Sequence, residues 1–456
     1  MWVPKLCCGS YEIQETRVLV SCSELSPSTI GPLQVNRQQF PPETKNSMGV
    51  ETYDGDLFPL QYLLPASCRL GASMYKFDSV RLSTTTDNPL AATAVAALRQ
   101  VAIQLELPLE KIQKFGLEVE KRMLPISYHN RVHVVDVLQL MYLQTAPGGP
   151  IHDICRDPVV KLSAVLAAVV HDLAHPGYNN AFLVDADHEI AKKFGKNSTS
   201  ETMHVALFKK LISNPELNFL ETLGSESRAR VLFYVEQIVL ATDMSKHMEY
   251  INSPLPVNKE ECILFKLAFA MKVADMSHNI RSFQMHNKFV DMLKEEFYEQ
   301  GDKERELQMQ ITTGMDRDEA YADIGEFQVR FLSIFIGPLL ERWHAHSQGS
   351  PLVKEMQQCL LRNMSMWSML SVRNIRPLQN KKAFAEAAQR NPLNTGHLDA
   401  RMPRRSTQCF ARGYGMDTGK EEIARAVDIF RKGFASTSER KSIDRTRLTV
   451  PHGTWG

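Results

Sequence analysis

The stretch LSAVLAAVVHDLAHPGYNN, residues 162–180, decides the fold class of this chain. Its residues up to Val170 are apolar or small and uncharged, which predicts a helix buried on most sides. This helix runs directly into His171 and Asp172, and His175 follows. A charge in a low-dielectric interior needs a partner. A divalent metal is one such partner, since imidazole and carboxylate suit zinc, manganese or magnesium; a structural His–Asp pair at the end of a core helix is the alternative.

A helical pattern of apolar residues extends over most of the chain. Helical patterns continue from about Tyr75 to about Leu370, with no run of alternating strands and no internal repeat. The sequence therefore predicts an all-α fold, a compact multi-helix domain over residues 73–375.

The two ends differ from this domain. Residues 1–72 scatter Pro, Ser, Gln and Thr without a period, which predicts a flexible or regulatory appendage. Residues 376–456 form a polar, basic tail. Within it, residues 420–434 are amphipathic. We interpret them as part of a solvated tail, and a helix that contacts a partner or a membrane is the alternative.

The composition is that of an ordinary soluble globular protein, with a net charge of +1, 23% charged and 43% hydrophobic residues. This neutrality argues against a dedicated nucleic-acid partner. The eight cysteines lack CxxC spacing, so we expect reduced thiols and a cytoplasmic protein. No stretch approaches the roughly 20 apolar residues of a spanning helix. Membrane association is expected only if Cys7 and Cys8 are acylated.

Further candidate ligands lie in other apolar helices. His129 and His133 are four residues apart, on one face if helical. The stretch AFAMKVAD ends an apolar helix on Asp275. One metal can sit on four side chains from three helices, with one carboxylate bridging to a second metal; these side chains are His133, His171, Asp172 and Asp275. Two-metal sites clamp an in-line displacement at phosphorus, so the pattern predicts metal-assisted hydrolysis of a phosphate ester.

Four longer motifs carry a specific resemblance: YHNxxHxxDV at 128–137, HDxxHxGxxN at 171–180, LATDMSKHM at 240–248 and EFYEQGDKE at 296–304. In this order and spacing they resemble the class I 3′,5′-cyclic nucleotide phosphodiesterases of the HD-domain superfamily. The resemblance runs from about Tyr75 to Trp343 and implies a catalytic domain of that type, which hydrolyses a small cyclic nucleotide to the 5′-monophosphate.

The resemblance also assigns roles in the chemistry. It implies that His133, His171, Asp172 and Asp275 bind metal, with zinc in the first site and magnesium or manganese in the second. A bridging hydroxide would attack the phosphate. His129 matches the general acid that protonates the leaving 3′ oxygen, and Glu201 or another nearby acid would keep it protonated. Residues that orient waters or ligands would be His175, Asn180, Glu201, His204 and Thr242.

The resemblance further implies a base pocket. Gln328 would face the purine edge and Phe331 would stack on the base, with Leu293 on its other side and Tyr128 also at the substrate. An amide can rotate to match either purine, but residues 240–248 are most similar to members that prefer cyclic AMP, so we expect cyclic AMP to be favoured over cyclic GMP.

The sequence departs from the family pattern at several points. Ala174 replaces a common acid, and His278 and Arg330 replace a usual asparagine and glycine near the base. One supporting histidine is also missing from the run at 201–204. An HD-type hydrolase of another nucleotide phosphate and an inactive nucleotide-binding scaffold stay open as alternatives, and so does a homodimer.

Overall fold

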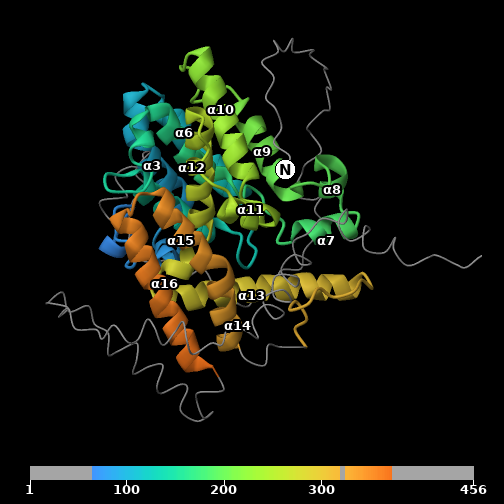
Figure 1. Cartoon of the computed structure of the whole chain (residues 1–456). Helices are drawn as coiled ribbons and strands as arrows, with labels where there is room; N and C mark the ends of the chain where they lie inside the picture. Colours follow the sequence, from blue (N-terminus) through green and yellow to red (C-terminus); the bar gives the residue numbers. More distant parts are fainter. Residues whose placement is uncertain (1–63, 319–323, 372–456) are drawn as a thin grey trace, which may run out of the picture. The chain divides into compact units, whose positions relative to one another are not determined.

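The computed structural model describes residues 64–318 and 324–371, and these residues form helices and no strand, which confirms the predicted all-α fold (Figure 1). The α-helices are α2 Ser79–Thr85, α3 Pro89–Gln104, α4 Leu109–Arg122, α5 Arg131–Thr145, α6 Pro158–Val170, α7 Asn180–Asp185, α8 Glu189–Phe194, α9 Thr199–Ile212, α10 Ser225–Leu240, α11 His247–Asn252, α12 Lys259–Asp275, α13 Phe283–Glu306, α14 Ile324–Phe331, α15 Gly337–His346 and α16 Pro351–Leu370. Short 3-10 helices, among them η4 Met244–Lys246 and η5 Ser277–Ile280, connect them.

Helix α6 lies at the centre of the described domain, as its sequence predicts. It packs against α3, α5 and α10, and every residue from Leu162 to Val170 is buried. The side chain of Asp157 accepts a hydrogen bond from the N–H of Val159, and Pro158 occupies the first turn. Both features favour a helix start at this point, so the buried helix has a fixed beginning and ends where the metal-ligand motif starts.

A buried ion pair joins α5 to η5. Arg281 and Asp136 are both fully buried, and Nε of Arg281 lies 3.1 Å from a carboxylate oxygen of Asp136. The same guanidinium donates to the carbonyls of Met74 and Asp136 and to Gln139 Oε1. Asp136 also accepts a hydrogen bond from the hydroxyl of Ser277 at 2.5 Å. The charges are therefore satisfied inside the core, as a buried pair requires.

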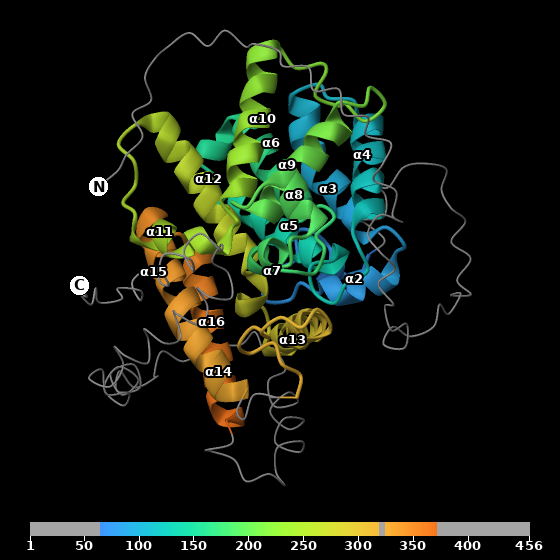
Figure 2. The same cartoon turned by 90° about the vertical axis from the view of Figure 1, so that its right-hand side faces the viewer.

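The helices α14 and α15 are joined by a π-helical turn, Leu332–Ile336. Pro338 stands two residues after this turn and has no N–H for a regular α-helical bond, which explains why the helix widens here. Figure 2 shows α14 running beside α16, which it contacts. Gln328 and Phe331 lie on α14 just ahead of the π turn.

The packed chain starts earlier than the expected boundary at residue 73. Leu64, Cys68 and Leu70 are buried in the main hydrophobic core, and Gln139 donates hydrogen bonds to the carbonyls of Leu70 and Ala72. Residues 64–72 bury apolar side chains but have no helical periodicity, so the sequence pattern alone did not assign them to the domain. The rest of the proposed appendage, with Cys7 and Cys8, and the tail with residues 420–434 lie outside the described residues.

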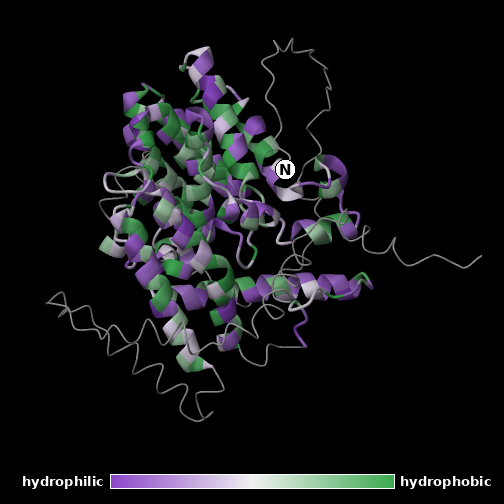
Figure 3. Ribbon diagram, in the orientation of Figure 1, coloured by the Kyte–Doolittle hydropathy of each residue, from purple (hydrophilic) through white to green (hydrophobic). Residues whose placement is uncertain are grey.

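The helices differ in hydropathy according to how deeply they are buried. Figure 3 shows polar residues predominating on α13, whereas the residues of α6 from Leu162 to Val170 are uncharged and buried. Within residues 64–318 and 324–371, no helix is long and apolar enough to cross a membrane.

Candidate metal centre and substrate pocket

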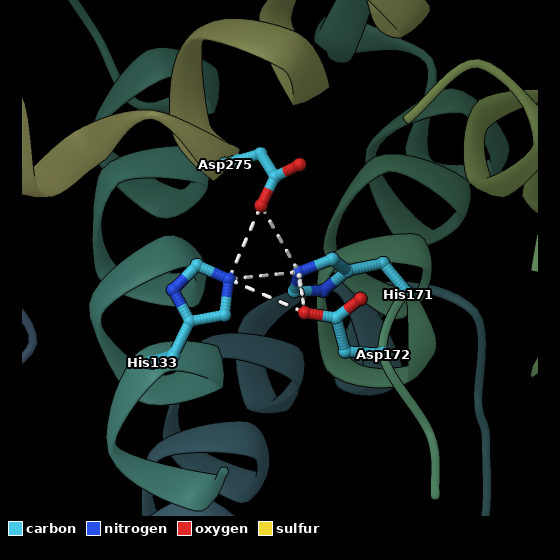
Figure 4. Close-up of side chains that lie close together, drawn as sticks. All are labelled: His133, His171, Asp172 and Asp275. Carbon is cyan, nitrogen blue, oxygen red and sulfur yellow. Dashed lines mark hydrogen bonds and ion pairs between the residues drawn. The ribbon is translucent and has the colours of Figure 1, made fainter. Parts of the chain in front are cut away.

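Four side chains that are distant in the sequence meet at one point (Figure 4). Nε2 of His133 lies 3.1 Å from Oδ1 of Asp275 and 3.3 Å from Oδ2 of Asp172. Nε2 of His171 lies 3.2 Å from the same Asp172 oxygen and 3.5 Å from Nε2 of His133. These are the four residues that the sequence predicted as metal ligands, and all four offer a ligand atom within 4.8 Å of the others.

The ends of three helices place these side chains. His133 lies in the first turn of α5, which begins where the side chain of Asn130 accepts a hydrogen bond from the N–H of Val132. His171 is the C-cap of α6, and Asp275 is the last residue of α12. Helix ends present side chains at the edge of the core, so the cluster is anchored by buried helices and still borders a pocket.

The donor set fits a divalent metal. Ligand atoms about 2.1 Å from one ion are roughly 3.0–3.5 Å apart at octahedral or tetrahedral angles, and the four separations given above lie in this range. Oδ2 of Asp172 is buried and has no hydrogen-bond partner among the described residues. Nδ1 of His171 donates to the carbonyl of Ala168 at 3.0 Å, which leaves Nε2 with its lone pair toward the cluster.

The charges in the cluster stabilise one another. Burial acts to lower the pKa of His171, but the carboxylates of Asp172 and Asp275 outweigh it and raise this pKa to about 10. Burial acts to raise the pKa of Asp172, but His171 and His133 hold it well below its usual range. A metal ion at this site would therefore displace protons from the imidazoles.

His129 is paired with Glu296, a residue whose role the sequence reading missed. Nδ1 of His129 lies 2.5 Å from Oε1 of Glu296, and the N–H groups of Tyr128 and His129 donate to Oε2. Burial acts to lower the pKa of His129, but Glu296 raises it to about 9. Glu201, named in advance as a candidate partner, instead accepts a hydrogen bond from Asn180, so that candidate was wrong. The motif at 296–304 contained the signal, since it begins with Glu296.

The positions of His129 and His175 are set by loop residues rather than by helical spacing. His129 precedes the N-cap Asn130 and is not on the helix that carries His133. His175 does not continue α6 either, because the helix ends at Val170 and Ala174 adopts the left-handed conformation with φ +59°. His175 directly follows this residue, and its ring stacks on that of His129 with the ring centres 4.0 Å apart.

The other polar residues expected near the metals line the same pocket. His204 donates from Nδ1 to the carbonyl of Leu173, and its Nε2 lies 3.9 Å from Oδ1 of Asp172. Burial lowers the pKa of His204 to about 4. Burial, supported by the charge of Asp243, raises the pKa of Glu201 to about 7. The predicted residues that border the pocket here are His175, Asn180, Glu201, His204 and Thr242.

The predicted substrate residues line the other walls of this pocket, namely Tyr128, Leu293, Gln328 and Phe331. Tyr128 is buried, and its ring packs on that of His133 with the ring centres 4.7 Å apart. It therefore contacts a predicted metal-binding residue and also lines the pocket. Gln328 is buried on α14 and lines this pocket.

His278, one of the departures from the family pattern, is held by a buried chain of hydrogen bonds. Nε1 of Trp367 donates to Nε2 of His286 at 2.8 Å, so His286 carries its proton on Nδ1. This atom lies 3.1 Å from Nδ1 of His278. Burial lowers the pKa of His278 well below its usual range, and the neutral ring therefore accepts at Nδ1 and carries its proton on Nε2.

The comparison with known proteins agrees with this site. A family model described as 3′,5′-cyclic nucleotide phosphodiesterase matches residues 128–360, about half of the chain. The chain therefore belongs to the 3′,5′-cyclic nucleotide phosphodiesterase family.

Three relatives illustrate the distance within the family. The probable 3′,5′-cyclic-AMP phosphodiesterase pde-4 of Caenorhabditis elegans is 27% identical over 289 residues, 60% of this chain and 42% of that protein. The probable 3′,5′-cyclic phosphodiesterase pde-3 of the same organism is 31% identical over 50% of this chain and 38% of its own length. The dual specificity calcium/calmodulin-dependent phosphodiesterase 1B of Mus musculus is 26% identical over 60% of this chain and 52% of its own. The matches thus span about half the length of these relatives or less.

Proposed function

We propose that this protein hydrolyses a 3′,5′-cyclic nucleotide to the 5′-monophosphate. The observation that carries this proposal is the cluster of His133, His171, Asp172 and Asp275 at the pocket that also contains the His129–Glu296 pair. A carboxylate–imidazole cluster next to a charged imidazole suits phosphate-ester hydrolysis. The family membership supports the same reaction class.

The four ligand residues would hold zinc in a first site, because two imidazoles and two carboxylates suit this ion. The second oxygen of Asp172 faces His204 and the polar side of the pocket, where water-rich coordination would suit magnesium or manganese. When bound, such cations lower the pKa of water to supply hydroxide and neutralise phosphate charge.

His129 would supply the proton that the leaving group needs. A hydroxide, formed from water that has released its other proton to solvent, would add to phosphorus; the bond from phosphorus to the 3′ oxygen would break, and the proton of His129 would pass to that oxygen and leave a neutral imidazole. Glu296 supports this role because its carboxylate fixes the ring through Nδ1. The other nitrogen, Nε2, is then the atom that donates to the substrate.

The base would lie between Phe331 and Leu293, with its edge toward the amide of Gln328. We propose that cyclic AMP is favoured over cyclic GMP, on the likeness of residues 240–248 to members that prefer cyclic AMP. The relatives differ in this respect, since one is named for cyclic AMP and another for dual specificity.

Steady-state kinetics of the full chain on cyclic AMP, cyclic GMP and nucleoside triphosphates test this function. We expect turnover of both cyclic nucleotides, a higher kcat/KM for cyclic AMP, and no hydrolysis of triphosphates. A kcat/KM for cyclic GMP at or above that for cyclic AMP would overturn the substrate preference. Hydrolysis of triphosphates alone would favour the other HD-type reaction, and binding without turnover would favour an inactive scaffold.

A further inference from the structure

A lysine is buried beside the metal cluster and has no part in the chemistry described above. Lys272 lies on α12 one helical turn before Asp275 and is 2% exposed. Lysine is almost never fully buried unless its ammonium group has partners. The apolar stretch AFAMKVAD contains it as the one cation, so the question is what this ammonium group holds.

The ammonium group of Lys272 bonds to the backbone that follows α10. Nζ donates to the carbonyl of Ala241 at 2.7 Å and to that of Asp243 at 3.2 Å. Ala241 is the C-cap of α10, where carbonyl groups lack helical partners and a cation is favoured. Nζ also lies 5.4 Å from the ring centre of Tyr250. These contacts join the helix that carries a metal ligand to a separate segment of the chain.

The segment that Lys272 holds forms one wall of the substrate pocket. Thr242, Asp243 and Met244 all line this pocket. The carboxylate of Asp243 accepts hydrogen bonds from the N–H of Ser245 and the hydroxyl of Ser198. Ser198 directly precedes α9, which carries Glu201 and His204. The wall therefore connects α12 to α9.

The surrounding charges keep the lysine protonated at neutral pH. Burial lowers the pKa of Lys272 to about 8, while the carboxylates of Asp275, Asp243 and Glu201 oppose this fall and Lys246 adds to it. The protonated ammonium group of Lys272 then has three N–H donors. A neutral apolar side chain of the same length would leave both carbonyl oxygens without this donor.

We propose that Lys272 is a positioning residue that holds the wall Thr242–Met244 in place through the carbonyl groups of Ala241 and Asp243. The wall lines the pocket that is proposed to bind substrate, and Lys272 acts through the wall. The kinetic consequence of this role rests on the proposed function, whereas its structural consequence does not.

Hydrogen–deuterium exchange of the full chain tests the structural consequence. Lys272→Met keeps the apolar stem and removes the donors. It should speed exchange of the amides in residues 242–252 about tenfold or more, since hydrogen bonds from a charged group are lost, and leave residues 131–145 unchanged. Lys266→Met is the matched control, because Lys266 lies on the same helix but pairs with Asp153 at 3.8 Å. It should exchange like the wild type.

Steady-state kinetics test the functional consequence. Lys272→Met should raise KM for cyclic AMP about tenfold with kcat within about threefold, because a loose wall must be ordered on binding. A general loss of folded protein would lower kcat and leave KM unchanged. Metal content of the protein should stay that of the wild type, since the four ligands are untouched.

The outcomes separate this inference from the proposed function. Unchanged exchange in residues 242–252, or equal acceleration in residues 131–145, overturns the positioning role. Local acceleration in a protein that turns over no cyclic nucleotide supports the positioning role and contradicts the proposed function. If Lys272→Met does not fold, Lys272→Gln, which keeps a shorter N–H donor, should show the same local change to a smaller extent, and its absence overturns the inference.

Discussion

Nδ1 of His129 lies 2.5 Å from Oε1 of Glu296, and the backbone N–H groups of Tyr128 and His129 donate to the other oxygen of the same carboxylate. Glu296 thus holds both the ring and the backbone of the residue that is proposed to donate a proton. The pair also fixes the charge of the ring, because Glu296 raises the pKa of His129 to about 9 against the effect of burial.

Glu296→Gln should move the alkaline limb of the pH–kcat profile to lower pH by more than about one unit. A proton donor is active below its pKa and loses activity as the pH rises through it. Without this carboxylate, burial lowers the pKa of His129 and only the charges of Asp172 and Asp275 oppose it, so the loss of activity begins at a lower pH. Glu299→Gln is the control, since Glu299 on the same helix bonds to Ser127 instead. An unshifted profile would show that Glu296 does not set this pKa.

His129→Ala should lower kcat by ~10²–10⁴ while metal content and fold stay intact. The loss should be much smaller on a nitrophenyl phosphate diester, whose leaving group needs no proton. Kinetics on both substrates and elemental analysis of the purified variant measure these effects. Loss of the metal, or equal loss on both substrates, would identify His129 as a ligand or a structural residue.

Chelation should abolish turnover, and zinc together with magnesium or manganese should restore it. Asp275→Asn should remove most metal and activity but leave the helical circular dichroism unchanged, because α12 ends at this residue and the core is untouched. Asp291→Asn, at an exposed position on α13, should keep both metal and activity. Full activity of the chelated enzyme would contradict a metal-dependent reaction.

Ala174→Gly should stabilise the protein by about 1 kcal/mol, because a left-handed alanine is strained by roughly 1–2 kcal/mol and the freedom of glycine in the unfolded chain offsets part of the gain. Thermal unfolding of the metal-loaded proteins measures the change. Gly177→Ala should have the opposite effect and destabilise the protein, because Gly177 has φ +81°, a conformation that is strained for alanine. Equal melting temperatures for all three proteins would mean that this turn relaxes without cost.

Arg281→Met should destabilise the protein by about 3–5 kcal/mol, since it leaves Asp136 charged and unpaired in the core. Urea unfolding of the variant and the wild type gives this difference. Arg305→Met removes an arginine whose ion pairs are exposed and should change little. A loss for Arg281→Met no larger than that of the control would show that water or a neighbouring group replaces the guanidinium.

Local sequence determined the helices and the four candidate ligands. An apolar run such as residues 162–170 is stabilised by burial in any compact fold. The polar residues that end two such runs, His171 and Asp275, are then expected at the edge of the core. Periodicity and helix ends are properties of neighbouring residues, so the all-α fold and the candidate ligands His133, His171, Asp172 and Asp275 could be predicted from the sequence, whereas their separations of about 3 Å depend on how the three helices pack.

Tertiary structure alone decided which distant groups pair. Glu296 lies on a largely polar helix, and Arg281 and Lys272 belong to residue types that are mostly exposed; each of the three is buried and has a partner far along the chain. The left-handed conformation of Ala174, shortly after α6 ends, is likewise a feature that helical periodicity does not reveal. Such pairings depend on how helices cross and loops close. Burying a charge is favourable only once these contacts bring its partner within hydrogen-bond distance.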